Sequence, residues 1–168
     1  MAAKIQPKLT GSVATFADDV LASAPSNNAT PIWLVDDQTA LDQLPSLGLL
    51  QRSWIKAQAF KPASRKLVSL PNADGTIHGI LSGTGPLPLD ARGDPMARQE
   101  LQLGHMAPLL TAATYQLATA VQDPELAAVA WGLGSYRYRR YKSAEGEPLP
   151  ILTIPSSADA KRIHAIVS

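Results

Sequence analysis

The chain alternates short apolar runs with segments of helical periodicity, and this alternation limits its fold more than any other feature. The predicted strands span residues 32–35, 67–70, 76–81, 114–118 and 148–155. The predicted helices span residues 14–24, 40–44, 47–60, 95–103, 123–142 and 157–168. Helices and strands that mix in this order form α/β sandwiches with a mixed sheet. We therefore predict an α/β fold.

Two local signals specify parts of this fold closely. Asp74-Gly75 lies between two runs of strand-forming residues and predicts a hairpin, so strands 67–70 and 76–81 should pair antiparallel. The helix that follows Ser46 should bury one face, formed by Leu47, Leu50, Trp54, Ile55 and Ala59. Its opposite face should be exposed and consists of Gln51, Arg52, Lys56 and Gln58. Thr39 is the predicted cap of the short helix before Pro45.

The helix that begins near Asp123 has the strongest signals in the chain. Asp123 can cap it and Pro124 suits its first turn, while Arg137–Lys142 bring cations to its carboxyl end. Glycine inside a helix costs about 1 kcal/mol relative to alanine. Gly132 and Gly134 therefore predict that another backbone packs very close to this helix. We expect Trp131 and the small residues beside it to lie in the core.

Composition excludes several classes of protein. The 168 residues suit one domain, and the absence of cysteine excludes a disulfide scaffold and thiolate metal sites. A net charge of +1 is too small for the domain as a whole to attract nucleic acid or an anionic membrane. Neither a secretory signal nor a membrane span is predicted, so we expect a cytoplasmic protein.

Candidate ligand and catalytic residues are few. His78, His105 and His164 have no partner at metal-ligand spacing. The paired carboxylates are Asp18-Asp19, Asp36-Asp37 and Asp90 with Asp94. Asp36-Asp37 follow a buried strand, where α/β folds bind ligands, but a turn or a helix start explains them better than catalysis does.

Two further segments invite a functional interpretation. Gly83-Thr84-Gly85-Pro86 weakly resembles a phosphate-binding loop, but the chain continues through Pro86 and Pro88 instead of entering a helix. Ser82 is not part of a Gly-x-Ser-x-Gly motif. Tyr136–Lys142 interleaves bases with aromatics as nucleic-acid contacts do, although helix-end charge and aromatic packing explain it more simply.

The last helix, residues 157–168, has Ser156 or Ser157 as its predicted cap and Asp159 in its first turn. Ile163, Ile166 and Val167 form its apolar stripe, and no stop signal follows them. A frayed C-terminus and a linker helix that leads into another domain both agree with this pattern.

The segment Trp131–Lys142 resembles the helix near the end of the N-terminal domain of leucyl (cytosol) aminopeptidases, particularly the bacterial branch. Ala130 and Tyr138 depart from that family's pattern. Other pieces agree in order: Trp33 with Leu34-Val35, Trp54 with Phe60, Leu70-Pro71 with Asp74-Gly75, and Leu109 through Thr114–Leu117. The resemblance covers residues 31–168, apart from a poor fit at 86–105.

The resemblance implies a macrodomain-like three-layer sandwich at residues 31–155. A leader at 1–30, flexible or with one short helix, would precede it. Residues 156–168 would begin a linker helix to a catalytic domain that this chain lacks. In such enzymes two divalent metals, zinc, manganese or magnesium, activate the water that attacks the peptide bond.

No catalytic, metal-binding or cofactor-binding residue carries over to any position of this chain, so we expect it to be inactive alone. The expected role is support of a hexamer and of access to the active site, with peptides as the parent's substrates. The exposed part of Arg137–Lys142 would face a neighbour or the catalytic domain. One alternative is an ADP-ribose or nucleotide module that uses Gly83–Gly85 and Asp36, and a second is weak nucleic-acid binding through the basic segment.

Overall fold

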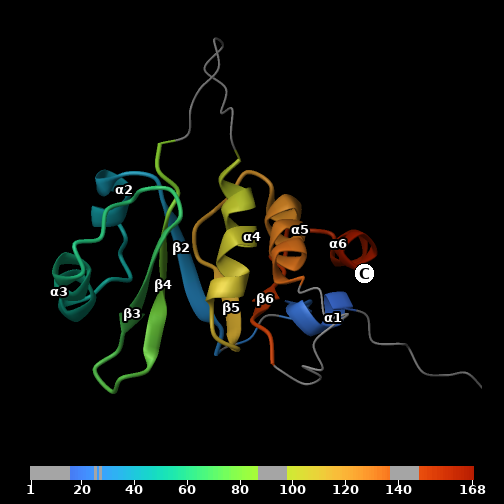
Figure 1. Cartoon of the computed structure of the whole chain (residues 1–168), viewed down its shortest axis with the longest axis horizontal. Coiled ribbons are helices and arrows are strands. Elements are labelled where there is room, and N and C mark those ends of the chain that lie inside the picture. Colours follow the sequence, from blue (N-terminus) through green and yellow to red (C-terminus); the bar gives the residue numbers. More distant parts are fainter. Residues whose placement is uncertain (1–15, 25, 27, 87–97, 137–147) are drawn as a thin grey trace, which may run out of the picture.

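The computed structural model describes residues 16–24, 26, 28–86, 98–136 and 148–168. Its centre is a six-stranded sheet in the order β1-β6-β5-β2-β4-β3 (Figure 1). The strands are β1 Leu21–Ala22, β2 Thr30–Val35, β3 Lys66–Pro71, β4 Ile77–Gly83, β5 Thr114–Leu117 and β6 Ile151–Thr153. The helices are α1 Phe16–Val20, α2 Gln38–Asp42, α3 Leu49–Ala57, α4 Gln102–Met106, α5 Pro124–Ser135 and α6 Ala160–Val167. Short 3-10 turns at Gln99–Leu101 and Ala107–Leu109 flank α4.

The sheet is mixed, as the order of elements predicts. Strands β1, β6, β5, β2 and β4 pair in parallel, and only the edge strand β3 runs antiparallel, to β4. The predicted hairpin is confirmed, and Gly75 in its turn has a φ of 84°, in the left-handed region that glycine adopts without strain.

Strand β2 shows how the sheet divides the interior into two cores. Ile32 and Leu34 face the core that α1, α4, α5 and α6 cover. Trp33 and Val35 face the second core, beneath α2 and α3. Because side chains alternate along a strand, β2 must be covered on both faces. The predicted sandwich of helices on both sides of a mixed sheet is therefore confirmed (Figure 1).

Helix α3 is present where predicted, but its buried face is only partly as predicted: Leu47 and Ile55 are buried, and Ala59 is exposed. Gln51 and Ile55 are buried, whereas Leu50 and Trp54 are 43% and 39% exposed. Burial of Gln51 is tolerated because both ends of its amide are bonded. Its Nε2 donates to Pro71 O (2.9 Å), and its Oε1 accepts from Gly48 N (3.1 Å). A polar residue with two such partners can replace an apolar one on the face that packs against the sheet.

Glycine lets α4 and α5 cross at backbone contact. A Cβ added to Gly134 would lie 2.0 Å from Gly104 O, so no side chain fits between the two helices. The predicted close approach of a second backbone is confirmed at Gly134. At Gly132 the neighbour is instead a side chain, with Val167 Cγ1 2.5 Å from the added Cβ. Trp131 is fully buried beside this crossing, as predicted.

Several predicted helix starts are wrong because other side chains provide the cap. Asp37, and not Thr39, caps α2 by accepting from Ala40 N (2.7 Å). Asp159, and not Ser156 or Ser157, caps α6 by accepting from the amides of Lys161 and Arg162. Aspartate is a stronger N-cap than threonine, which explains α2. Serine is as good a cap as aspartate, but only Asp159 directly precedes the first residue of α6. The Asp123 cap of α5 is confirmed, because its Oδ1 accepts from Leu126 N.

Other boundaries also differ from the predictions. The helix expected over 14–24 ends at Val20, since Leu21–Ala22 form β1 and pair with β6. Of the helix expected over 95–103, residues 99–101 form a 3-10 turn and the α-helix begins at Gln102, while Asp94, Pro95 and the two residues after it lie outside the described residues. Helix α5 ends at Ser135 because the following residue, Tyr136, has extended backbone (ψ 115°).

A buried carboxylate that the sequence analysis missed supports the start of α5. Glu100 is 1% exposed, and its Oε1 accepts from Asp123 N (3.0 Å). A carboxylate at this end of a helix interacts favourably with the helix dipole. Glu100 therefore connects the 3-10 turn before α4 to the amino end of α5.

The hairpin tip holds a carboxyl group, that of Asp74, whose pKa is lowered by hydrogen bonds. The Thr76 hydroxyl donates to Asp74 Oδ1 (2.6 Å), and the Thr76 amide donates to the same atom (2.9 Å). These hydrogen bonds favour the charged form, so they lower the pKa of Asp74 below its ordinary 3.8. Because the pKa is lower in the folded chain, the stabilisation exists above pH 3.8 and is lost as the pH falls through the folded pKa.

We predict that Gly134→Ala lowers the free energy of unfolding by about 2 kcal/mol or more, because the new methyl group meets backbone and overpacking outweighs the gain in helix propensity. Gly132→Ala is the matched control and should cost less, since the Val167 side chain near the end of α6 can shift. Chemical denaturation of both variants measures the difference. A Gly134→Ala midpoint equal to that of the wild type would contradict the close crossing.

We predict that Thr76→Val raises the pKa of Asp74 toward 3.8. The substitution removes the hydrogen bond from the Thr76 hydroxyl, which lowers this pKa most. An NMR titration of the Asp74 side chain follows this change. Thr111→Val removes a hydroxyl elsewhere and should leave the Asp74 titration unchanged. An unaltered Asp74 midpoint in Thr76→Val would show that the hydroxyl does not stabilise the carboxylate.

Candidate functional site

The carboxyl edge of the parallel strands is where an α/β fold most often binds ligands. Asp36 and Asp37 follow β2 at this edge, and both are exposed. Asp37 is used as the cap of α2, which confirms its interpretation as a helix start. Thr84 follows β4 and is bonded through its amide and its hydroxyl to Val35 O (2.8 and 3.3 Å). Thr84 thus ties β4 to β2 at the edge where a ligand would bind.

The glycines of the Gly83–Gly85 loop make room for the chain itself. A Cβ on Gly83 would lie 2.4 Å from Ala63 O, and a Cβ on Gly85 would lie 3.1 Å from Ser64 N. Gly85 also has a φ of 67°. The segment that precedes β3 therefore occupies the space that a phosphate group would need. This packing does not favour the alternative of a nucleotide module built on this loop and Asp36.

The three histidines lie apart and serve different contacts. The His78 ring stacks on Trp33, with centroids 5.7 Å apart, and its half-buried position on β4 is as predicted. His105 Nε2 lies 3.3 Å from Arg65 Nη2, and His164 Nδ1 lies 2.7 Å from Ala160 O. No three His, Cys, Asp or Glu side chains gather within the part of the chain that the structure describes.

The remaining sequence candidates are divided between described and undescribed parts. Asp18 and Asp19 lie on α1, and Asp18 Oδ1 is 3.6 Å from His164 Nε2. Asp90 and Asp94 lie outside the described residues, as does the basic segment from Arg137 to Lys142. Tyr136, the residue just before this segment, packs edge-on against Phe16, with ring centroids 5.6 Å apart.

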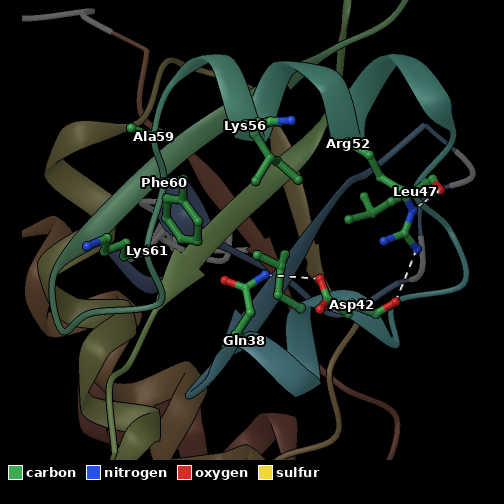
Figure 2. A pocket seen from close by; sticks show the side chains of 10 residues that line it. Gln38, Asp42, Leu47, Arg52, Lys56, Ala59, Phe60 and Lys61 are labelled. Atoms are coloured by element: carbon green, nitrogen blue, oxygen red, sulfur yellow. Dashed lines mark hydrogen bonds between the residues drawn. The ribbon is translucent and has the colours of Figure 1, made fainter.

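A pocket of about 470 Å³ lies between α2 and α3 (Figure 2). Its walls include Leu41, Leu47, Ile55 and Phe60. Arg52 enters it from α3 and donates to the backbone oxygens of Asp42, Leu44 and Leu47 (3.0–3.2 Å). Gln38 donates to the Asp42 carboxylate (3.0 Å). These polar groups hold α3 to the preceding connection.

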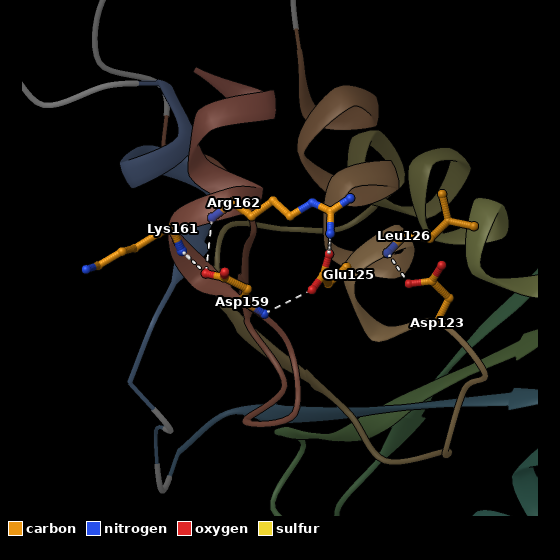
Figure 3. Close-up of polar contacts among 6 residues, drawn as sticks. All are labelled: Asp123, Glu125, Leu126, Asp159, Lys161 and Arg162. Atoms are coloured by element: carbon orange, nitrogen blue, oxygen red, sulfur yellow. Dashed lines mark hydrogen bonds and ion pairs between the residues drawn. The ribbon is translucent and has the colours of Figure 1, made fainter.

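A second polar cluster joins α6 to the start of α5 (Figure 3). Glu125 Oε1 accepts from Asp159 N (3.4 Å), and Glu125 Oε2 lies 3.5 Å from Arg162 Nη1. Beneath this contact Ile163 and Val167 are buried in the core, whereas Ile166, the third member of the predicted stripe, is 51% exposed. The sequence places Glu125 in the first turn of the helix but does not reveal these partners, because they lie more than thirty residues away. Helix α6 is therefore held in one orientation on the domain.

We predict that Glu125→Ala speeds hydrogen exchange of the Ile163 and Val167 amides by about two- to fivefold, since an exposed ion pair of this kind contributes at most about 1 kcal/mol. Lys161→Ala is the matched control, because this exposed side chain points away from the cluster in Figure 3. Equal exchange rates in Glu125→Ala and wild type would show that apolar packing alone holds α6.

No helix among the described residues is both long enough and apolar enough to cross a bilayer.

Comparison with known proteins gives one consistent result. The cytosol aminopeptidase of Coxiella burnetii is similar in structure, with a TM-score of 0.69 and 22% identity, over 88% of this chain and 30% of that one. The bottromycin maturation enzyme BotP, solved in complex with Mn, has a TM-score of 0.52 and 19% identity, over 81% of this chain and 28% of that one. The chain thus spans about a third of the length of these enzymes. No curated protein sequence matches it.

The family model for the M17 aminopeptidase N-terminal domain matches residues 30–155. This range contains β2 to β6 and ends before α6. It also includes the predicted hairpin and the helix that carries Trp131, two of the features on which the sequence resemblance rests. The chain therefore belongs to the family of M17 aminopeptidase N-terminal domains.

Proposed function

We propose that this domain is the non-catalytic N-terminal part of a two-metal aminopeptidase that removes N-terminal residues from peptides. The observation that carries the proposal is the family match over residues 30–155. The similarity to about a third of each aminopeptidase-like structure supports a longer parent protein, in which the remaining length holds the catalytic domain.

The described residues do not fit the two metals that such an enzyme needs. They bring together no group of three potential ligands, and Asp37 is already used as a helix cap. We therefore assign the metals, zinc or manganese, to the catalytic domain. The presence of Mn in the BotP structure supports a divalent metal in the parent enzyme. No step of the reaction is assigned to a residue of this chain.

In this proposal residues 31–155 are the folded body of the domain and residues 156–168 begin a linker helix. The family match ends at residue 155, just before α6, which supports a boundary there. Glu125 and the two buried residues of α6 would set the direction in which the chain leaves the domain. The domain would thereby position its catalytic partner and contribute to a hexamer. The name of the Coxiella relative, a cytosol aminopeptidase, supports a cytoplasmic location.

We predict that the 168-residue chain does not hydrolyse leucine p-nitroanilide in the presence of Mn²⁺ or Zn²⁺, because the groups that bind the metals lie elsewhere. A full-length cytosol aminopeptidase assayed in parallel is the positive control. Turnover that rises with the concentration of the chain would contradict the proposal.

The same preparation should bind no ADP-ribose in a calorimetric titration, since the segment before β3 fills the Gly83–Gly85 loop. Micromolar binding of ADP-ribose would favour the nucleotide module instead.

A further inference from the structure

A smaller cavity, of about 170 Å³, lies between α4 and the β3–β4 hairpin. We call it the α4 pocket. Its polar lining residues include Arg65, Ser82, Gln102 and His105, and its apolar walls include Leu67 and Met106. Its side chains come from five places in the chain: the turn before β3, strand β3, strand β4, helix α4 and the 3-10 turn that ends at Leu109. It contains hydrogen-bonding groups that the fold does not use.

Ser82 is the clearest of these groups. Its side chain lies on the same face of β4 as Ile80, toward α4, and the residue is only 2% exposed. Its hydroxyl has no hydrogen bond to any described residue, whereas the hydroxyl of nearby Thr84 is bonded to Val35 O. The hydroxyl oxygen is not enclosed by protein atoms, so it reaches the space of the α4 pocket. Ser82 therefore presents a donor to whatever occupies the α4 pocket.

Arg65 supplies a positive charge at the exposed side of the same pocket. Its backbone has a φ of 63°, a conformation that is uncommon for residues other than glycine and is often found at functional sites. The Nη2 atom of Arg65 lies 3.3 Å from His105 Nε2, and this contact leaves most of the five N–H donors of the guanidinium unused. No carboxylate lines the pocket among the described residues. The charge of Arg65 thus favours an anionic occupant.

Gln102 closes one side of the pocket. Its Nε2 donates to Ser64 Oγ (3.1 Å), so α4 is tied to the residue that precedes Arg65. This contact fixes the helix against the turn that carries the arginine. The two sides of the pocket are therefore held together without a ligand.

We infer that the α4 pocket binds a short aliphatic monocarboxylate. The Arg65 guanidinium and the Ser82 hydroxyl donate to the carboxylate, and Leu67 and Met106 contact the carbon chain. The single guanidinium matches one negative charge, and the apolar walls favour a carbon chain over inorganic phosphate. A cavity of about 150 Å³ holds benzene, so the α4 pocket suits a ligand of about six to nine heavy atoms. ADP-ribose is far too large for it.

The absence of a carboxylate from the described lining also predicts discrimination against amino acids. The ammonium group of leucine would lie near Arg65 without an acidic partner, and like charges repel. 4-Methylpentanoate has the same carbon skeleton and carboxylate but no ammonium group. We expect it to bind about tenfold or more tightly than leucine.

NMR titration of the ¹⁵N-labelled 168-residue chain at pH 7 with 4-methylpentanoate, leucine and inorganic phosphate tests the inference. 4-Methylpentanoate should produce saturable shifts in the amides of residues 64–67, 82 and 102–106. Arg65→Gln and Ser82→Ala should each weaken its binding by about tenfold. Arg162→Gln, which removes a distant exposed arginine, should leave its affinity unchanged.

Ser82→Ala also separates a ligand group from a structural one. Because its hydroxyl bonds to no described residue, its removal should not lower the denaturation midpoint of the free chain. A lowered midpoint would show that Ser82 has a structural partner, and it would overturn the assignment. Arg65→Gln changes an exposed side chain and gives an independent readout if Ser82→Ala fails to fold.

Three results of the titration would overturn the inference. These are the absence of saturable shifts up to about 10 mM ligand, shifts that persist unchanged in Arg65→Gln, and equal binding of phosphate and 4-methylpentanoate. The last result would indicate an adventitious ion only. None of them bears on the proposed aminopeptidase role, which the activity assay tests separately.

Discussion

The packing of α5 against the sheet is the interaction on which most of the structure depends. Trp131 is fully buried in it, its ring lies 5.8 Å from that of Tyr115 on β5, and its Nε1 donates to Pro150 O just before β6. On its other sides α5 meets the backbone of α4 at Gly134 and the side chain of Val167 at Gly132. One helix thus positions two strands and two helices. Its small residues are required because only they let the neighbouring elements approach so closely.

The polar side chains discussed above have two kinds of role. Most of them hold parts of the fold together: Arg52 binds three carbonyl groups, Gln51 links α3 to the end of β3, and Glu100 supports the start of α5. These hydrogen bonds are all made within the fold. Ser82 and Arg65 are different, because one has no bonded partner among the described residues and the other has spare donors. This contrast, more than the size of a cavity, identifies where the domain can bind a ligand.

The arrangement of α6 matters for the role proposed for the domain. A linker that swings freely would carry no geometric information to a second domain, whereas a docked helix would hold that domain in a defined direction. Two features dock α6. Burial of Ile163 and Val167 supplies most of the free energy, and the contacts of Glu125 with Asp159 and Arg162 orient the amino end.

The amino-acid sequence by itself determined the features that depend on neighbouring residues. Asp74-Gly75 specified the hairpin, Asp123-Pro124 specified the start of α5, and Gly134 indicated the close helix crossing. The sequence also carried the family resemblance. Local signals of this kind act over a few residues, so they are legible without knowledge of the fold.

Only the tertiary structure decided which polar residues are buried and which distant partners they contact. The buried face of α3 contains Gln51 because Pro71 O lies within reach of its amide, and Pro71 is distant in the sequence. Tertiary packing also brings Glu125 into contact with α6. It likewise places Arg65, His105 and Ser82 around one pocket. The burial of a polar side chain depends on partners that the fold brings from elsewhere, and periodicity within one segment does not contain that information.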